Sequence, residues 1–182
     1  MDKNHTPFEN LQLLEENLVP TSVSILLYEK AFSKIKLIQE LATNQNLPIL
    51  YIDLDFLFSG YAKSQLLNIP NLSLFNTVES NIDEILPKLL TKISKEPHLV
   101  IFDSINGLYN TLSNNADSGR VVNSILMLLA QNSIFSKSIL IILALSGNKD
   151  DRRILPNGRQ ILENENIKIF FISDRSKITI EK

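Results

Sequence analysis

Apolar residues follow two different patterns along this chain, and the two patterns alternate. Short continuous apolar runs are typical of strands that are buried on both faces. They predict strands at 22–27, 49–54, 72–75, 99–102 and 138–145. Apolar residues spaced three or four positions apart are typical of helices with one buried face. They predict helices from Ile35 to Ala42, over 80–94 and over 120–130.

The two ends of the chain add shorter elements. Pro7 to Asn17 is predicted to form a short amphipathic helix, and Pro20 ends it before the first strand. Further predictions are a short helix at 61–67, a polar loop at 146–158, and two terminal strands, 167–172 and 177–180, joined by a hairpin turn. Strands that alternate with helices predict a three-layer α/β fold, in which a mainly parallel sheet carries helices on both faces. We expect a single domain over 1–182, with an N-terminal helical segment at 1–20 and a core at 21–182.

Composition narrows the class of protein. The 182 residues are 44% hydrophobic and 21% charged, which is typical of a soluble globular chain. No apolar run approaches the roughly 20 residues of a membrane helix, and the acidic, polar start is unlike a signal peptide. The absence of cysteine fits a cytoplasmic location. His5 and His98 are too isolated to suggest a metal centre, and a net charge of −2 restricts any nucleic-acid contact to a local patch.

The first strand, the helix after it and the second strand form a βαβ unit, where many α/β proteins carry the phosphate-binding loop GxxxxGK[ST]. Here that motif falls on Tyr28 to Ile35, and only Lys34 survives. Tyr28 and Ser33 replace the glycines that let the backbone curl around a phosphate, and Ile35 replaces the hydroxyl residue that binds magnesium. We interpret Lys34 as a solvated lysine at the start of a helix, where the dipole allows weak anion binding.

Four segments, taken in order, resemble the RecA/recombinase superfamily of ATPase cores, especially the short archaeal recombinase paralogues and their circadian-clock-ATPase relatives. They are YEKAFSKI, YIDLD, LVIFDSINGLY and the tail that begins ILPNGRQ. The resemblance covers nearly all of 22–182 and implies a RecA-like fold of the P-loop NTPase type. It places Asp55 at the catalytic carboxylate and Asp103, followed by Ser104, at the aspartate that orders magnesium.

Because the loop glycines and the magnesium hydroxyl are missing, we interpret these positions as vestigial. The vestigial nucleotide-binding residues are Tyr28, Ser33, Lys34, Ile35 and Ser104, and the vestigial catalytic residues are Asp55 and Asp103. A strand that ends in Asp followed by Ser commonly caps the next turn, so we expect that structural role for Asp103. We expect no metal, no cofactor and no tight Mg-ATP binding.

The 146–158 loop corresponds, in the resemblance, to the DNA-binding loop of the recombinases. A modest basic cluster lies in it or just after it, namely Lys149, Arg152, Arg153 and Arg159, with Asp150 and Asp151 among them. The loop has no aromatic residue for base stacking. Two interpretations stay open, a plain solvated loop and weak, sequence-independent contact with single-stranded DNA.

The resemblance leads to one expected function and two alternatives. We expect a non-catalytic RecA-like protein, a pseudo-ATPase that serves as a scaffold or partner subunit in DNA recombination and repair. The alternatives are an ATP-binding RecA-like ATPase with an atypical phosphate loop, and a RecA-like subunit of an Elongator-type complex. A subunit without its own chemistry acts by contact, so we expect a protein partner or self-association, with Tyr28 and Phe32 free to pack against it.

Overall fold

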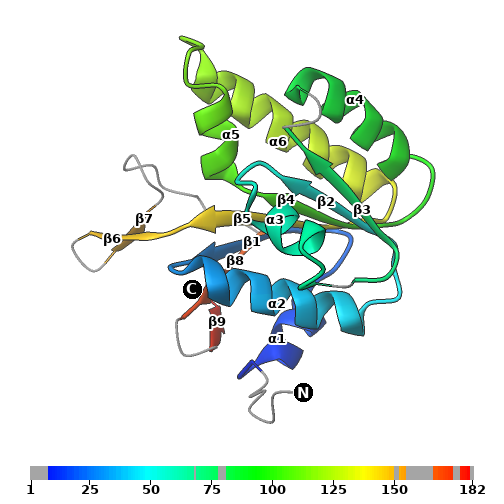
Figure 1. Cartoon of the computed structure of the whole chain (residues 1–182), viewed down its shortest axis with the longest axis vertical. Coiled ribbons are helices and arrows are strands. Elements are labelled where there is room, and N and C mark those ends of the chain that lie inside the picture. The colour runs from blue at the N-terminus through cyan, green and yellow to red at the C-terminus, as the bar shows by residue number, and fades with distance from the viewer. Residues whose placement is uncertain are drawn as a thin grey trace.

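A seven-stranded sheet forms the middle layer of the protein in the computed structural model, which describes residues 8–67, 69–77, 81–149, 152–154, 166–173 and 177–180 (Figure 1). Its strand order is β3-β2-β4-β5-β1-β8-β9. Every neighbouring pair is parallel except β8 and β9. The strands are β1 (Val23–Tyr28), β2 (Ile49–Asp53), β3 (Leu72–Asn76), β4 (Leu99–Asp103), β5 (Ile139–Leu145), β8 (Ile167–Ile172) and β9 (Ile178–Ile180). The predicted mainly parallel sheet is therefore confirmed.

Helices cover both faces of this sheet, because successive side chains of a strand point to opposite faces and both sets are apolar. In β1, Leu26 belongs to one buried cluster, while Ile25 and Leu27 belong to the other. The first cluster packs against α1 (Leu11–Asn17), α2 (Ala31–Asn44) and α3 (Leu57–Lys63). The second packs against α4 (Ile82–Ile93), α5 (Ile105–Thr111) and α6 (Ser118–Phe135). The three-layer α/β architecture expected from the sequence is the one observed.

Several boundaries differ from the predicted ones. The helix predicted at 61–67 is instead α3, which begins at Leu57, and α6 is longer than the predicted 120–130. The α5 helix was not predicted. The prediction of a loop over 146–158 is wrong in part, because β6 (Gly147–Lys149) and β7 (Arg152–Ile154) pair antiparallel as a small hairpin. The predicted turn between β8 and β9 includes residues 174–176, which lie outside the described residues.

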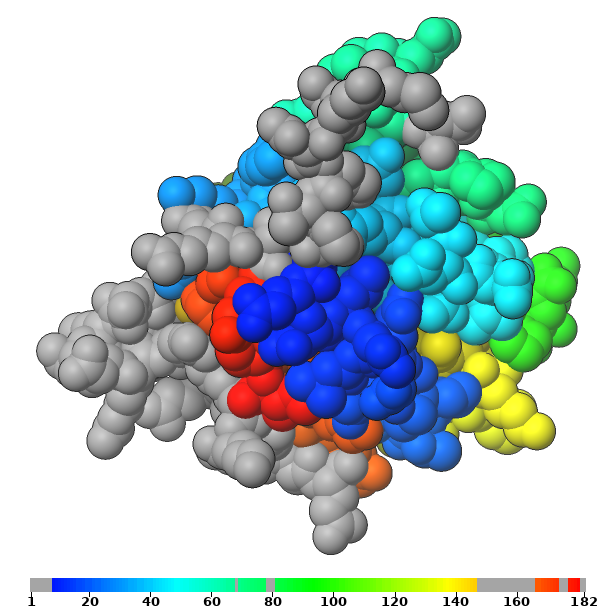
Figure 2. All heavy atoms as spheres, turned by 90° about the horizontal axis from the view of Figure 1, so that it is seen from below, coloured from blue at the N-terminus to red at the C-terminus, as the bar shows by residue number. Residues whose placement is uncertain are grey.

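The N-terminal segment contributes to the core. Phe8, Leu14 and Leu18 are buried against α2 and the sheet. The backbone carbonyl of Glu9 accepts a hydrogen bond from the backbone N–H of Ile178 at 3.1 Å, so this segment also covers part of β9. Seen from below, residues near the start of the chain lie directly beside the last strand (Figure 2). Across the described residues, no helix is long and apolar enough to span a membrane.

Candidate functional site

Polar side chains gather at the carboxyl ends of the central strands. The chain leaves β2 toward α3 on one face of the sheet and leaves β4 toward α5 on the opposite face. In open α/β sheets, ligands bind at the carboxyl edge where such connections diverge. Tyr28 ends β1, Asp53 ends β2 and Asp103 ends β4, while Lys34 reaches the same place from the first turn of α2. The residues that the sequence singled out are thus brought together.

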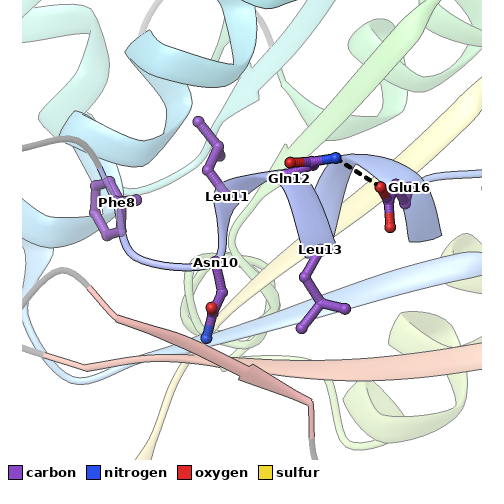
Figure 3. A pocket seen from close by; sticks show the side chains of 6 residues that line it. All are labelled: Phe8, Asn10, Leu11, Gln12, Leu13 and Glu16. Carbon is purple, nitrogen blue, oxygen red and sulfur yellow. Dashed lines mark hydrogen bonds between the residues drawn. The ribbon is translucent and has the colours of Figure 1, made fainter.

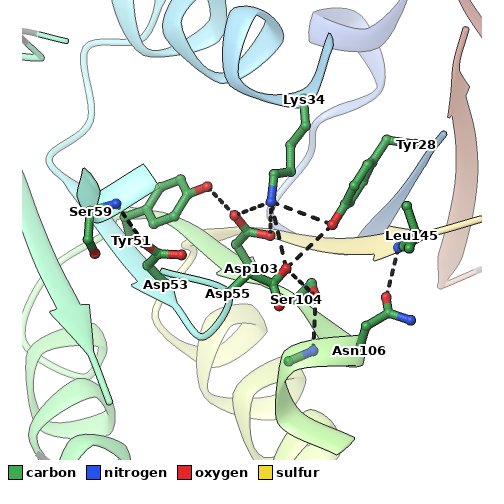
Figure 4. A network of polar contacts seen from close by, with 11 residues as sticks. Tyr28, Lys34, Tyr51, Asp53, Asp55, Ser59, Asp103, Ser104, Asn106 and Leu145 are labelled. Atoms are coloured by element: carbon green, nitrogen blue, oxygen red, sulfur yellow. Dashed lines mark hydrogen bonds and ion pairs between the residues drawn. The ribbon is translucent and has the colours of Figure 1, made fainter. Parts of the chain in front are cut away.

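The centre of this cluster is an ion pair between Lys34 and Asp103 (Figure 4). Lys34 Nζ lies 2.7 Å from both carboxylate oxygens of Asp103. The Tyr51 hydroxyl donates a third hydrogen bond to Asp103 Oδ2 at 2.6 Å. The Lys34 side chain is 1% exposed and the Asp103 side chain 0%, so water solvates neither charge to any great extent. Buried charges persist in proteins only when they are paired and hydrogen-bonded in this way.

These contacts correct two sequence-based interpretations. Lys34 is not a solvated lysine, because the apolar stripe of α2 carries it into the interior. Asp103 does not cap the turn that follows it. The cap is Ser104, whose Oγ accepts a hydrogen bond from the Gly107 backbone N–H at 3.1 Å and so satisfies the first turn of α5.

Asp55 lies beside the pair and is its most exposed carboxylate neighbour, with a side chain that is 26% exposed. Its Oδ2 accepts a hydrogen bond from Ser104 Oγ at 2.8 Å and lies 3.7 Å from Lys34 Nζ. The Tyr28 hydroxyl is 3.5 Å from both Asp55 Oδ2 and Lys34 Nζ. Asp55 is therefore held by a hydroxyl and a shared cation, at the edge where solvent reaches the network.

Gly107 lets α5 approach Asp55 this closely. A Cβ atom at position 107 would lie 2.5 Å from Asp55 Oδ1 and 2.7 Å from Leu54 Cβ, which is closer than real Cβ contacts. The absence of a side chain at Gly107 therefore helps to position both the Ser104 cap and the Asp55 carboxylate.

Three members of the network were not predicted from the sequence. They are Tyr51, Ser59 and the first carboxylate of the YIDLD segment, Asp53. The Ser59 backbone N–H donates to Asp53 Oδ2 at 2.6 Å, and the Tyr51 ring stacks on Phe58 at a centroid distance of 3.9 Å. A tyrosine that follows two aliphatic residues in a predicted buried strand was the available signal, because a buried Tyr hydroxyl needs a hydrogen-bond partner.

The segment between β1 and α2 is too short to surround a phosphate. β1 runs through Tyr28 and α2 begins at Ala31, so only Glu29 and Lys30 connect them. The Lys34 backbone N–H already donates to the Lys30 carbonyl at 3.3 Å, in the α-helical pattern. A phosphate-binding nest needs several successive N–H groups on a curled backbone. At the positions compared with the phosphate-loop motif, this chain has no glycine, and α2 begins at Ala31.

Besides Lys34, three of the positions compared with the phosphate-loop motif carry buried side chains. Ser33 and Ile35 are buried, and Ile35 offers no oxygen. Tyr28 is also buried, with Lys34 Nζ 4.8 Å from the centroid of its ring, a cation–π distance. Tyr28 is therefore not available to a partner, contrary to the prediction, whereas Phe32 is exposed.

Burial also shifts the protonation of the network. It raises the pKa of Asp103 to about 6, even though Lys34 and the Tyr51 hydrogen bond act in the opposite direction. The pKa values of Tyr28 and Tyr51 are also raised above their ordinary value. Burial is the largest cause, and the negative charge of Asp103 is the next. Both phenols therefore keep their protons at neutral pH and serve as hydrogen-bond donors.

Three of the four predicted DNA-contacting residues lie in the small hairpin, away from this network in the sequence. Lys149 ends β6, opposite Arg152 of β7 in the pairing register, and Arg153 lies opposite Asn148. Arg159 falls outside the described residues. The structure therefore brings three of the four predicted basic positions onto one two-stranded element.

A separate shallow hollow of about 490 Å³ runs along α1 (Figure 3). Its lining includes Phe8, Asn10 and Leu13, and its one charged residue, Glu16, accepts a hydrogen bond from Gln12 at 2.9 Å. This lining contains no cation that would attract a phosphate. Among the residues that the structure describes, no group of three or more acidic or histidine side chains is placed to hold a metal ion.

The chain matches no protein-family model, and a search of the curated proteins also finds no match. Its class is thus defined by its own fold and site. It is a three-layer α/β protein in which a buried lysine–aspartate pair occupies the carboxyl edge of a mostly parallel sheet.

Proposed function

We propose that this chain is a non-catalytic RecA-like protein, a pseudo-ATPase that acts as a scaffold or partner subunit in DNA recombination and repair. One observation carries the proposal. The lysine that the resemblance assigns to the phosphates is already neutralised, because its ammonium group lies 2.7 Å from both carboxylate oxygens of Asp103. Asp103 is the residue that would order magnesium, so a single contact occupies both halves of the expected nucleotide site.

A nucleotide would have to compete with this contact. Separating a buried ion pair costs about 3–5 kcal/mol when one charge is left behind. At roughly tenfold for each 1.4 kcal/mol, that cost weakens nucleotide affinity by about two to three and a half orders of magnitude. The two-residue connection between β1 and α2 offers few backbone N–H groups in return. These terms together favour contact with a protein partner over ATP chemistry as the role of this chain.

Isothermal titration calorimetry with Mg-ATP tests the proposal. We expect no heat of binding beyond dilution and no phosphate release above background. An ATP-binding protein of similar size, titrated in the same buffer, shows that the measurement is sensitive enough. Micromolar binding by this chain would contradict the proposal and favour the alternative of an ATPase with an atypical loop.

Direct contact with single-stranded DNA stays a prediction of the resemblance. It would run through phosphates, so it should be weak, independent of sequence and reduced by salt. Fluorescence anisotropy of a labelled oligonucleotide can compare the wild type with an Arg152→Ala, Arg153→Ala variant. Equal binding by both proteins would contradict the assignment to the hairpin. Absence of binding at low salt would leave only an indirect DNA role, and would suit an Elongator-type context as well as a repair context.

A further inference from the structure

The outer surface of α6 differs from that of its neighbour in the same layer. α6 carries no charged residue from Val121 to Phe135, a run that covers most of the helix. Its exposed side presents Met127, Leu128 and Phe135, and Phe135 is 91% exposed. The adjacent α4 is ordinary by comparison, because its exposed side carries Asp83, Glu84, Lys88 and Lys92. The exposed positions from Val121 to Phe135 are Asn123, Ser124, Met127, Leu128, Gln131 and Phe135, so this face is uncharged and half apolar. Large apolar side chains that gather on one uncharged face are typical of a surface that another protein covers.

The spacing of the exposed residues on α6 fits a second helix. Ser124, Leu128, Gln131 and Phe135 follow one another at intervals of four, three and four residues, the spacing of a coiled-coil seam. If an identical helix lies antiparallel, Ser124 faces Phe135 of the other copy, and Leu128 faces Gln131. A small side chain then opposes the large ring, at both ends of the contact. A parallel arrangement would instead place the two Phe135 rings against each other.

The charges at the two ends of α6 favour the same arrangement. Asp117 immediately precedes the helix and Lys137 follows it, and both are exposed. Within one chain, Asp117 Oδ1 lies 3.7 Å from Arg120 Nη1. Antiparallel pairing in the register above places Asp117 of one copy at the same end as Lys137 of the other, offset by about five residues or roughly 7.5 Å along the axis, twice in each dimer. It also places the exposed Arg120 near the C-terminal end of the other helix, where the helix dipole favours a cation. Parallel pairing would place like charges together at both ends.

We infer that α6 is a homodimer interface in which the helices of two copies pack antiparallel about a two-fold axis. The inference rests on the proposed contact role only in that it names one partner, a second copy of this chain. An 18-residue helix is about 27 Å long, so one helix pair covers less than the ~800 Å² per partner of a standard interface. We therefore expect a weak and reversible dimer.

Sedimentation equilibrium of the full chain, over a range of concentrations, tests the dimer. Phe135→Glu places a charge at the seam twice per dimer, so it should raise the dissociation constant by about a hundredfold. Because Phe135 makes few contacts within its own chain, far-UV circular dichroism should be unchanged. Leu66→Glu is the matched control, since Leu66 is 69% exposed and lies outside α6. A monomeric wild type, or equal dissociation constants for wild type and Phe135→Glu, would overturn the inference.

Zero-length carbodiimide cross-linking tests the antiparallel arrangement without any substitution. Asp117 and Lys137 stand at opposite ends of α6, about 30 Å apart at 1.5 Å per residue, so a direct bond between them must join two chains. Mass spectrometry should find this cross-linked peptide in the wild type and not in Phe135→Glu at the same concentration. A dimer without this cross-link would overturn the antiparallel pairing. Failure of the dimer inference is distinguishable from failure of the proposed function, because the proposed function is tested by the Mg-ATP titration.

Discussion

Replacement of Lys34 by methionine is the most direct test of the buried pair. Lys34→Met removes the charge and keeps most of the side-chain volume, so it creates little cavity. The Asp103 carboxylate is then left in the interior with the Tyr51 hydroxyl as its nearest donor. Breaking a buried pair by removing one partner costs about 3–5 kcal/mol. That is a large part of the roughly 5–15 kcal/mol by which a domain of this kind is stable.

The structure indicates how much stability should be lost when each of the two charges is removed. The pKa of Asp103 is already about 6 with Lys34 in place, because burial outweighs the attraction of the ammonium group. Without Lys34 the pKa rises further, and Asp103 takes up a proton near neutral pH, which limits the penalty. Among the carboxylates that the structure describes, Asp103→Asn leaves Lys34 with the more distant Asp55, at 3.7 Å. The double variant removes both desolvation penalties, so it should be more stable than the sum of the single losses predicts, by about 1–3 kcal/mol.

Urea unfolding followed by far-UV circular dichroism measures these free energies, provided that the slope m is unchanged between variants. Lys88→Met on the exposed side of α4 is the control for loss of a lysine, and should stay within about 0.5 kcal/mol of wild type. A loss of less than about 1 kcal/mol for Lys34→Met would show that the pair contributes little to folding. Strict additivity in the double variant would show that the two charges do not interact, and would refute the reasoning.

Two further predictions concern the same network. Since the pKa of Asp103 is raised from its usual 3.8 to about 6, the folded state binds this proton more tightly than the unfolded chain, and the group's contribution to stability is largest at low pH. The contribution of this group to the free energy of unfolding should therefore fall by about 3 kcal/mol as pH rises from about 4 to about 6. The measurement is the difference in free energy of unfolding between wild type and Asp103→Asn, and a difference that does not change with pH would contradict the prediction. Gly107→Ala should lower the urea midpoint by an equivalent of about 1–3 kcal/mol, because its Cβ would collide with Leu54 and Asp55. Gly60→Ala in α3 has open space around the new Cβ and should be neutral or up to about 1 kcal/mol stabilising, so equal losses at the two glycines would count against the packing argument.

The strands could be predicted from the sequence because this sheet is buried on both faces. Continuous apolar runs mark such strands, and the observed β1, β2, β4 and β5 lie within about a residue of the predicted ranges. The α5 helix could not be found in the same way. It is seven residues long, INGLYNT, and contains a glycine and two asparagines, so neither periodicity nor helix propensity identifies it. Its existence depends on the Ser104 cap and on close packing at Gly107.

The members of the site were predicted better than their roles. Lys34 and Asp103 were both singled out, but they are 69 positions apart, and a single sequence does not show that they touch. The burial of Lys34 did have a signal. It precedes Leu37, Ile38 and Leu41 by three, four and seven positions, so the helical period places it on the buried stripe of α2. A lysine in a first turn was interpreted as solvated because most lysines are, and here a buried counter-charge overrides that preference.

The pairing of Lys34 with Asp103 changes what their presence says about activity. Once a cation and a carboxylate face each other in the interior, each becomes necessary to the fold, because the loss of either leaves the other buried and uncompensated. Folding alone then accounts for both residues, whether or not a nucleotide ever binds, so neither supports catalysis in this chain. A catalytic role would need a group that folding does not require. Within the described network, Asp55 comes closest, because its side chain is 26% exposed and its strongest bond is to the Ser104 hydroxyl.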